Sequence, residues 1–378
     1  MKRLGFPRMY KEKNERRAFL PDFFEQLARI DASIVLERGY GSRMGYTEDD
    51  YTSVNPNIVF ADAEEANDQD VVVILRSPKN EEMDCFKAGT TLVSMLHYPT
   101  REHRVQILKD KAIQAVSLDS IRDDFMQRIV YNPKGTSYNG METAFHELAK
   151  ARKDFFSKGR APIEVSIIGM GMIGHRAARS AAKFGSKELH EQIKAHLSKG
   201  VIIHMLPRSI TSDRFEMSRI LAATDILVDA STRDNPYRFI LDNDLLGVLK
   251  EDAIILDLTA DPYLSDVEGV QVKALEGIPT GNLNKYVLYA DDPSYDEIPA
   301  VVRTINRRTV VSCDAWPGVK PEACMRLYGK QLLPILVRLA EKDISEMSLE
   351  SQDYFERAIH RATLEFYEEH EKLAIPSV

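Results

Sequence analysis

The sequence is poor in cysteine. Its 378 residues include only Cys85, Cys313 and Cys324, which are scattered and lack the spacing of a metal-binding motif. An odd, unclustered set of cysteines is typical of reduced thiols, so we predict a cytoplasmic protein without a disulfide framework or a metal site. Each cysteine is expected to pack as a small hydrophobic side chain.

Long hydrophobic runs and an excess of basic residues are also missing. The apolar runs have the length of strands, far short of the roughly 20 residues that cross a bilayer. The first residues, 1–7, lack the apolar core of a signal peptide. The chain carries 50 Lys and Arg residues against 58 Asp and Glu, a net charge of −8 without a basic block. Neither a membrane nor a nucleic acid is therefore an expected partner.

The composition is instead that of a globular protein, 44% hydrophobic and 29% charged, over a length that allows two domains. In the first third, strand-like runs alternate with helical patterns, which predicts a parallel sheet covered on both faces. The expected helices are residues 21–29, 48–53 and 101–111. The expected strands are residues 4–6, 33–37, 57–60, 71–75, 91–96 and 113–118.

A glycine-rich turn in mid-chain is the most informative motif. The apolar strand 165–168 runs into Gly169, Gly171 and Gly174, and an Ala-rich helical segment follows up to residue 184. In a dinucleotide-binding turn these glycines permit the tight bend, the approach of a pyrophosphate and close packing of the helix on the strand. The helix N-terminus then offers free N–H groups to the phosphates. The alternative is an ordinary strand–turn–helix unit without a ligand.

A second strand–helix series surrounds this motif. An amphipathic stretch, 140–157, leads into it, and two largely helical segments, 323–342 and 348–372, follow a proline-rich break. The fold class is therefore α/β, with two Rossmann-like domains, mostly parallel sheets and a substrate cleft between the domains. We expect a substrate domain of residues 1–135 plus 318–378 and an inserted dinucleotide-binding domain of residues 136–317. The expected strands of the inserted domain are residues 165–168, 201–206, 226–230, 253–258 and 310–314.

Polar side chains follow several of the predicted strands. Arg16 and Arg17 lie in a cationic turn, where planar guanidinium groups suit a carboxylate. Arg76 and His97 follow two later strands, and a histidine there can transfer protons because its pKa lies near neutrality. Solvated charges and a packed histidine are the alternatives.

Two aspartates, Asp257 and Asp261, lie at the end of the strand expected at 253–258, where a nicotinamide would bind. A carboxylate at this place can orient a histidine or a bound water. Helix capping by either aspartate is the alternative.

Several short motifs occur in an order and spacing that carry a resemblance. They are Arg-Leu-Gly-Phe-Pro at 3–7, Asn-Glu-Arg-Arg-Ala-Phe-Leu-Pro at 14–21, Met-Leu-His at 95–97, the glycine turn, Leu-Asp-Leu-Thr-Ala-Asp at 256–261, and Val-Ser-Cys-Asp-Ala-Trp-Pro-Gly-Val at 311–319. Over nearly its whole length the sequence resembles alanine dehydrogenase. That group includes lysine-forming saccharopine dehydrogenases and the NAD(H)-binding subunit of proton-translocating transhydrogenase.

The resemblance implies roles for individual residues. Arg16 would bind the substrate carboxylate, with Arg17 able to share that work, and His97 would be the catalytic histidine. Asp261 would lie near the nicotinamide and the substrate. Asp314 resembles an aspartate of saccharopine dehydrogenases, whereas the alanine enzymes carry an asparagine one position later, where this chain has Ala315. That difference argues against a plain alanine enzyme.

One departure from the family lies at position 76, where the family usually has a lysine. Arg76 stays protonated, so it can hold an anion but cannot act as a base. His97 would then transfer protons alone or with an aspartate, unless Lys79 substitutes. Because the transhydrogenase subunits lack both the lysine and the histidine, His97 favours a working dehydrogenase.

A second departure concerns the cofactor, which the resemblance gives as NAD or NADP. Its expected ligands are Gly169, Gly171, Met172, Ile173, Gly174, Arg208 and Asp257. NAD selectivity usually requires a carboxylate at the end of the second strand. Here a helical insertion, 186–199, intervenes, and the strand 201–206 ends in Pro207-Arg208-Ser209. An Arg-Ser pair suits a 2′-phosphate, although ordinary loop charge also explains Arg208.

The sequence thus predicts an NAD(P)-dependent oxidoreductase acting on the CH–NH group of an amino acid or an opine-like secondary amine. The small-molecule partners would be amino acids and 2-oxo acids. The alternatives are a transhydrogenase-like subunit that passes hydride to a protein partner, and a catalytically idle NAD(P)-liganded regulator. The segment 348–372 is expected to clasp its own domain or to form a homo-oligomer interface.

Overall fold

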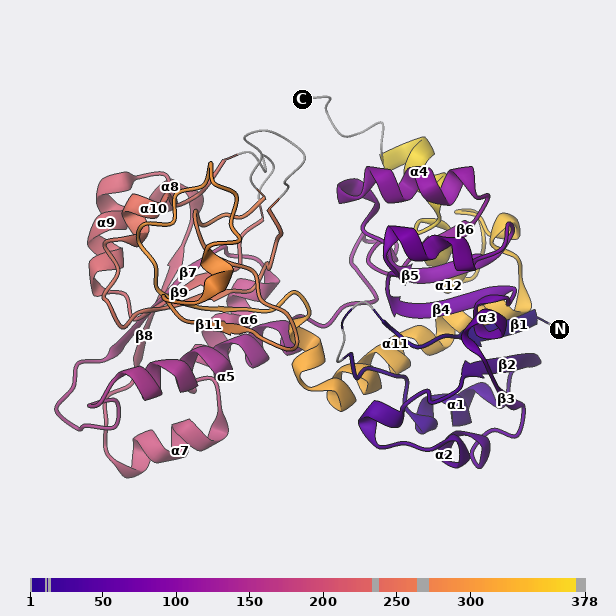
Figure 1. The fold of residues 1–378 in the computed structure, drawn as a ribbon, viewed down its shortest axis with the longest axis horizontal. Helices are drawn as coiled ribbons and strands as arrows, with labels where there is room; N and C mark the ends of the chain where they lie inside the picture. Colours follow the sequence, from indigo (N-terminus) through magenta and orange to yellow (C-terminus); the bar gives the residue numbers. More distant parts are fainter. Residues whose placement is uncertain (1, 11, 13–14, 233–237, 264–271, 372–378) are drawn as a thin grey trace. The chain divides into compact units, whose positions relative to one another are not determined.

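The computed structural model describes residues 2–10, 12, 15–232, 238–263 and 272–371. Lys13, Asn14 and Lys372, which belong to segments discussed above, lie outside this range. The chain forms two compact units, the first made of Met1–Asn132 and Pro321–Val378 and the second of Pro133–Lys320. It passes once from the first unit into the second and then returns, as the colours of Figure 1 trace.

The first unit contains a six-stranded sheet in which all the paired strands are parallel. Its strand order is β3-β2-β1-β4-β5-β6, and the order reverses between β1 and β4. Such a reversal opens a crevice at the carboxyl ends of the strands. The strands are β1 (Lys2–Phe6), β2 (Ala32–Glu37), β3 (Ile58–Ala61), β4 (Val71–Arg76), β5 (Thr91–Met95) and β6 (Gln114–Ser117).

Helices surround this sheet because its strands are apolar on both faces. In β4 the first five residues, Val-Val-Val-Ile-Leu, are all buried, as expected of a central parallel strand. The α-helices of the unit are α1 (Pro21–Leu27), α2 (Glu48–Thr52), α3 (Ala63–Asn67), α4 (Glu102–Asp110), α11 (Pro321–Glu341), α12 (Tyr354–His360) and α13 (Leu364–Phe366). A π-helical turn, Tyr367–Glu371, follows α13.

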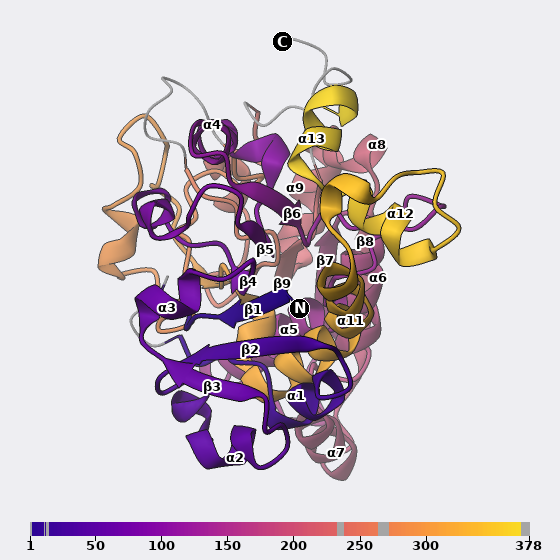
Figure 2. The ribbon, with the colours of Figure 1, turned by 90° about the vertical axis from the view of Figure 1, so that its right-hand side faces the viewer.

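The C-terminal helices pack on the sheet of the first unit. Helix α11 contacts α1 and β1 (Figure 2), and Gly329 lies so close to Phe23 that an added Cβ would come within 3.2 Å of its ring. Farther along, the backbone N–H of Ser117 at the end of β6 donates to the carbonyl of Ala362 at 2.8 Å. The described part of the segment 348–372 therefore clasps its own unit.

The second unit contains a six-stranded sheet of order β11-β12-β10-β9-β7-β8, parallel except for β11. The strands are β7 (Ile163–Ile168), β8 (Val201–Leu206), β9 (Ile226–Asp229), β10 (Ile254–Asp257), β11 (Val287–Leu288) and β12 (Thr309–Ser312). The helices are α5 (Pro133–Ala151), α6 (Met172–Ala181), α7 (Lys187–Ala195), α8 (Arg208–Thr211), α9 (Arg214–Ala223) and α10 (Asn243–Leu246).

The α/β class with two mostly parallel sheets is confirmed, and each expected strand has a counterpart within a few residues. Two expectations were wrong in detail. Strand β11 was not predicted, because two residues are too short to show an alternating pattern. Helix α5 begins at Pro133, seven residues before the stretch recognised as amphipathic. In the second unit the order reverses at β7, between β8 and β9, so the crevice of this sheet opens beside the glycine turn.

Candidate dinucleotide-binding site and polar strand ends

The glycine turn joins β7 to α6, and its three glycines meet different surroundings. Gly169 has φ +103°, and a Cβ there would lie 2.3 Å from the carbonyl oxygen of Ala230. A Cβ on Gly174 would lie 2.0 Å from the carbonyl oxygen of Gly169. Around Gly171, the N-cap of α6, nothing lies within 4 Å of an added Cβ. Gly169 and Gly174 are therefore required by packing, whereas Gly171 leaves open space at the helix N-terminus.

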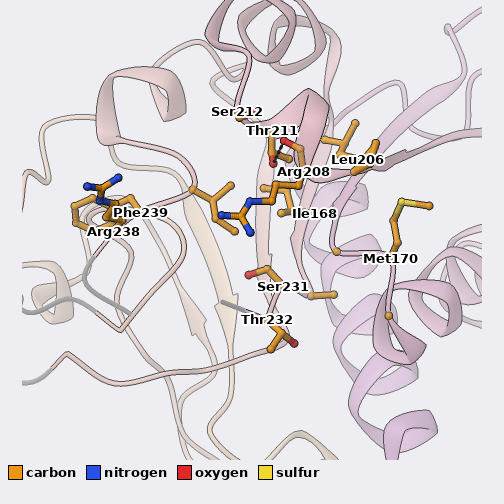
Figure 3. Close-up of a pocket in the computed structure, with 15 residues that line it drawn as sticks. Ile168, Met170, Leu206, Arg208, Thr211, Ser212, Ser231, Thr232, Arg238 and Phe239 are labelled. Carbon is orange, nitrogen blue, oxygen red and sulfur yellow. Dashed lines mark hydrogen bonds between the residues drawn. The ribbon is translucent and has the colours of Figure 1, made fainter. Parts of the chain in front are cut away.

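A cavity of about 710 Å³ lies at the carboxyl ends of β7, β8 and β9, beside this open space. Figure 3 draws the residues around it. They are Ile168, Gly169, Met170, Gly171, Leu206, Pro207, Arg208, Thr211, Ser212, Ala230, Ser231, Thr232, Arg238, Phe239 and Ile240. Of the residues expected to bind a cofactor, Gly169, Gly171 and Arg208 line the cavity. Met172, Ile173 and Gly174 follow directly as the first turn of α6.

Two arginines line this cavity from different segments. Arg208 follows β8 directly, and in Figure 3 its guanidinium extends into the middle of the group of lining residues. Arg238 lies beside Phe239 at the other side of the group. Sequence reasoning did not find Arg238, because no strand or turn pattern marks it. The end of β9, with Ser231 and Thr232, could have been found by the same strand-end rule that selected Arg76 and His97.

Asp257 does not line the cavity, because its carboxylate is buried and fully hydrogen-bonded. One oxygen accepts from the backbone N–H groups of Thr259 and Ala260 at 3.1 and 2.7 Å. The other accepts from Lys273 Nζ and Ser312 Oγ, both at 2.9 Å. Asp257 thus shapes the turn after β10 and presents no free oxygen to a ligand.

Asp229, at the end of β9, is paired in register with Asp257 and is also buried. Its Oδ1 accepts from the backbone N–H and the hydroxyl of Ser231, at 3.0 and 2.6 Å, and so fixes one wall of the cavity. Burial and the neighbouring Asp257 raise the pKa of Asp229 to about 6. Burial also disfavours the Asp257 anion, but the Lys273 ammonium holds the pKa of Asp257 below its ordinary value. Lys273 thus pairs directly with Asp257, and its charge does not outweigh the burial and repulsion that raise the pKa of Asp229.

Asp261 and Asp314 are held by neighbouring residues of one segment. The hydroxyl of Thr280 donates to the carbonyl of Asp261 at 3.3 Å, and the N–H of Asp314 donates to the carbonyl of Gly281 at 3.1 Å. The Asp314 side chain is exposed and that of Asp261 is half-buried. Both residues lie in the second unit.

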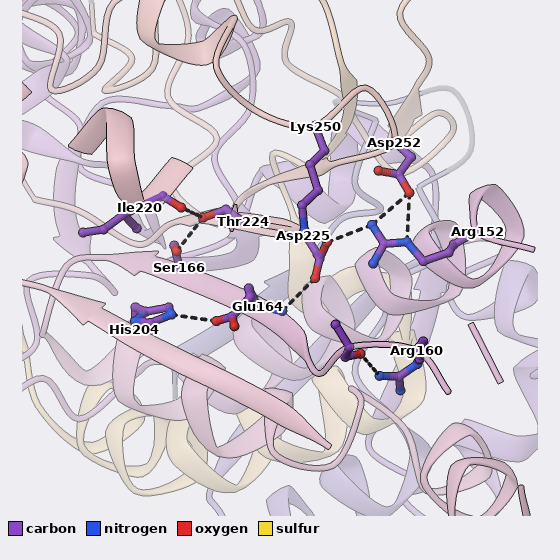
Figure 4. Close-up of polar contacts among 11 residues, drawn as sticks. Arg152, Arg160, Glu164, Ser166, His204, Ile220, Thr224, Asp225, Lys250 and Asp252 are labelled. Carbon is purple, nitrogen blue, oxygen red and sulfur yellow. Dashed lines mark hydrogen bonds and ion pairs between the residues drawn. The ribbon is translucent and has the colours of Figure 1, made fainter. Parts of the chain in front are cut away.

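A different polar cluster lies at the opposite, amino-terminal edge of the same sheet (Figure 4). There the buried Asp225 accepts from Lys250 Nζ at 2.6 Å, from the N–H of Glu164 at 2.7 Å, and pairs with Arg152 at 2.8 Å. His204 Nε2 lies 2.7 Å from Glu164. These groups are mutually satisfied and far along the strands from the glycine turn, so we treat them as structural.

In the first unit, Arg17 and Arg76 share one partner. Arg17 makes a two-pronged ion pair with Glu15, at 2.8 and 2.6 Å, and its side chain is 4% exposed. Arg76 Nη1 lies 3.5 Å from Glu15 Oε2 and also pairs with Glu12. Arg16 is exposed. The sequence singled out the arginines but not the two glutamates that neutralise them.

His97 forms a second polar group in this unit, with Asp119. The His97 Nδ1 lies 3.3 Å from Asp119 Oδ2, and the backbone N–H of His97 donates to Oδ1 at 3.2 Å. Ser117 Oγ also donates to Oδ1, at 2.8 Å. Burial works against the Asp119 anion, but the hydrogen bonds from His97 and Ser117 hold the pKa of Asp119 well below its usual range. Asp119 was missed, although it directly follows a predicted strand that neighbours β5.

Comparisons with known proteins agree with this architecture. Residues 5–131 match the family model described as alanine dehydrogenase/PNT, N-terminal domain. The alanine dehydrogenase of Bacillus subtilis is 22% identical over 349 residues, which cover 90% of this chain and 86% of that protein. The NAD(P) transhydrogenase subunit alpha of Haemophilus influenzae is 19% identical, covering 94% of this chain and 70% of that one.

The expected resemblance is confirmed. A solved L-alanine dehydrogenase superposes with a TM-score of 0.70 at 17% sequence identity, covering 96% of this chain and 94% of the other. At that identity the superposition establishes the fold alone. Within the described part of the chain, no helix has the length and hydropathy to cross a membrane, and no cluster of three or more His, Cys, Asp or Glu side chains could hold a metal ion.

Proposed function

We propose that the chain is an oxidoreductase of the amino-acid dehydrogenase type that binds NAD or NADP. The observation that carries this proposal is the cavity at the carboxyl ends of β7, β8 and β9, which includes the glycine turn. Similarity to alanine dehydrogenases over about nine-tenths of the chain supports the reaction class. The substrate would carry a CH–NH₂ or CH–NH group, as an amino acid or an opine-like secondary amine does.

The residues of the cavity fit a dinucleotide. The open space at Gly171 admits a pyrophosphate close to the backbone, and the N-terminus of the ten-residue α6 offers N–H groups and positive potential. Gly169 and Gly171 with the first turn of α6, Met172 to Gly174, would hold the phosphates. When bound, the nicotinamide would donate or accept the hydride. Asp257 would contribute to the site indirectly, because its carboxylate holds the backbone of the turn after β10.

His97 is the proposed acid–base residue. Asp119 engages Nδ1 of the ring, which favours the tautomer with the proton on Nδ1 and leaves Nε2 as the basic atom. The His97 side chain is 52% exposed, so this atom is accessible to a substrate. In the reductive direction His97 would give up a proton to the substrate, and in the oxidative direction it would remove one.

The arginines differ in their proposed tasks. Arg16, which is exposed, would bind the substrate carboxylate, and Arg17 would shape this site through Glu15. Arg76 pairs with Glu12 and Glu15 and its side chain is 10% exposed, so it would position these two carboxylates. A guanidinium stays protonated and cannot replace the basic lysine of the family. Asp261 is proposed to orient the reacting groups, and Asp314 to contact the substrate.

A transhydrogenase-like subunit that passes hydride to a protein partner is the second candidate. The similarity to the alpha subunit from H. influenzae across 94% of this chain favours it. The two candidates differ in a simple respect: only the dehydrogenase turns over free amino acids.

The test is a screen of the purified chain for changes in NADH and NADPH absorbance. L-Amino acids are supplied with oxidised cofactor, and 2-oxo acids with ammonia or primary amines are supplied with reduced cofactor. The dehydrogenase proposal requires turnover with one of these sets and a loss of about 100-fold or more in kcat for His97→Ala, with cofactor affinity retained. If the chain binds a dinucleotide tightly but turns over none of these substrates, the dehydrogenase proposal is wrong and the transhydrogenase-like subunit is favoured.

A further inference from the structure

The cavity carries a further inference about which dinucleotide it selects. We propose that Arg208, assisted by Arg238, binds a 2′-phosphate on the adenosine ribose, so that the chain prefers NADP(H) to NAD(H). This inference rests on the proposed function, because it assumes that a dinucleotide occupies the cavity.

The position of Arg208 carries the first step. In a Rossmann unit the pyrophosphate lies at the glycine turn after the first strand, and the adenosine ribose lies at the end of the neighbouring second strand. Here these strands are β7 and β8, which pair in register along their whole length, from Ile163↔Val201 to Ile168↔Leu206. The residues after Leu206 are Pro207 and Arg208, and both line the cavity. The ribose 2′-position is therefore the part of the ligand that Arg208 would meet.

The charge of the cavity carries the second step. NAD-selective sites place a carboxylate at this strand end, which accepts hydrogen bonds from the ribose hydroxyls and repels a 2′-phosphate. Among the described residues that line this cavity, none is acidic and two are arginines, Arg208 and Arg238. A phosphate monoester carries about −1.5 to −2 charges at neutral pH and is bound by the planar guanidinium fork. Two guanidinium groups attract that charge, whereas the 2′-hydroxyl of NAD is neutral and offers them at most an uncharged hydrogen-bond acceptor.

The surrounding residues give this site shape as well as charge. Figure 3 places the Arg208 guanidinium between the ends of β7 and β8 and the Phe239 segment, with Arg238 on the far side of that space. Ser231 and Thr232 line the same cavity, and Asp229 fixes Ser231 through its N–H and hydroxyl. The acidic Asp229 is itself turned into the protein, where it is 1% exposed. Its negative charge is thus kept from the wall that faces the ligand.

The experiment compares binding of 2′,5′-ADP with 5′-ADP, and of NADP⁺ with NAD⁺, by isothermal titration calorimetry on the full chain. The unmodified protein is expected to bind the 2′-phosphorylated member of each pair at least about tenfold more tightly, with an affinity that falls as salt rises. Arg208→Ala should weaken binding of NADP⁺ by roughly 10- to 100-fold and leave NAD⁺ almost unchanged. Arg208→Asp should reverse the preference.

Arg219→Ala is the matched control. Arg219 is an exposed arginine of α9 in the same unit, but it pairs with Glu216 at 2.8 Å and does not line the cavity. The Arg219→Ala variant should therefore bind 2′,5′-ADP, 5′-ADP, NADP⁺ and NAD⁺ with unchanged affinities. Circular dichroism and thermal unfolding of each variant separate a lost contact from a lost fold.

The outcomes distinguish a failure of the NADP(H) preference from a failure of the proposed function. Equal or tighter binding of the ligands without the 2′-phosphate overturns the selectivity and leaves the proposed function standing. An Arg208→Ala variant that weakens NAD⁺ and NADP⁺ equally also overturns it. Failure of both ADP forms and both dinucleotides to bind the folded protein overturns the proposed function itself.

Discussion

His97 Nδ1 and Asp119 Oδ2 lie 3.3 Å apart at the carboxyl ends of the neighbouring parallel strands β5 and β6. The aspartate side chain is 7% exposed and the histidine side chain 52% exposed, so the pair has one buried and one accessible member. A buried carboxylate in this position can fix the orientation and tautomer of an imidazole that meets a substrate. The His97 backbone, at φ +53°, is held by the same carboxylate through its N–H.

Replacing Asp119 with Asn should test this relationship. We expect kcat to fall about 10- to 100-fold with little change in KM, because the amide no longer stabilises the charged imidazole. The free energy of unfolding at pH 7 should fall by about 2 kcal/mol, because a buried, charge-assisted hydrogen-bond group is lost. Steady-state kinetics and urea unfolding measure the two effects, with the exposed Asp31→Asn as a control. A loss of stability with unchanged kcat would make Asp119 purely structural.

The pH dependence of that destabilisation has a defined sign. The pKa of Asp119 is lower in the folded chain than its ordinary value. Its stabilising contribution is therefore fully present above about pH 4 and is lost as the pH falls toward the folded pKa. The difference in unfolding free energy between the natural chain and Asp119→Asn should therefore narrow as the pH falls below about 4 toward the folded pKa of Asp119.

Asp229 should show the opposite pH dependence. Because its pKa is raised to about 6, the folded chain holds a proton between about pH 4 and pH 6 that the unfolded chain releases. Its carboxylate therefore costs stability as the pH rises through this window. Asp229→Asn keeps an oxygen that can accept from Ser231 and removes the repulsion from Asp257, so we expect it to gain about 1 to 2 kcal/mol relative to the natural chain between pH 4 and pH 7.

Unfolding by urea at a series of pH values measures this gain. The exposed Asp291→Asn provides the baseline for a substituted aspartate in the same unit. A variant whose disadvantage or advantage stays the same from pH 4 to pH 7 would contradict the raised pKa of Asp229.

The cluster around Asp225 offers a prediction about stability alone. Asp225 is buried and pairs with both Arg152 and Lys250, and burial is outweighed by these partners, which lower its pKa. Removing it in Asp225→Ala leaves two cations and the N–H of Glu164 without this acceptor, and should cost about 3 kcal/mol. Asp252→Ala is the matched control, because Asp252 pairs with the same Arg152 but is 37% exposed. It should cost less than about 1 kcal/mol.

Thermal and urea unfolding measure the stability of both variants. Titration with a dinucleotide measures their cofactor affinity. Cofactor affinity should be the same in both folded variants, because the cluster lies at the amino-terminal edge of the sheet. Equal costs for the two substitutions would mean that burial of Asp225 adds nothing to the pair. A change in cofactor affinity would contradict the structural role of the cluster.

The sequence predicts the sheets well because their central strands, such as β4, β9 and β10, are buried on both faces. Continuous apolar runs such as Val71 to Leu75 are typical of parallel strands that are covered on both faces. The glycine turn also marks one junction between a strand and a helix. Strand β11 escapes this reasoning, since its two residues pair with β12 through the backbone and show no pattern of their own.

The site was predicted less completely, because partners depend on contacts between distant segments. Arg17 and Arg76 were recognisable as strand-end cations, but their pairing with Glu15 requires the fold of the loop after β1. Lys273 lies in an irregular segment, and nothing in its neighbourhood marks it as the counter-ion of Asp257. Asp119 could have been found, because adjacent parallel strands bring their carboxyl ends together.

The glycine turn allows binding and stability to be separated by two substitutions two residues apart. Gly169→Ala forces a methyl group at φ +103° to within 2.3 Å of the Ala230 carbonyl, so we expect it to lower the free energy of unfolding by about 2 to 4 kcal/mol. Gly171 has φ −76°, which any residue adopts, and its Cβ would meet nothing within 4 Å. Gly171→Ala should therefore change stability by less than about 1 kcal/mol.

The effect on ligand binding should be the reverse. A methyl group at Gly171 enters the space through which a pyrophosphate would approach the N-terminus of α6, so dinucleotide affinity should fall on the order of tenfold or more, about 1.4 kcal/mol per factor of ten. Titration with NADP⁺ and NAD⁺ measures this loss, and both ligands should weaken equally because they share the pyrophosphate. An alanine at 171 that leaves both affinities intact would show that the phosphates bind elsewhere, even if the cavity still takes up a nucleotide.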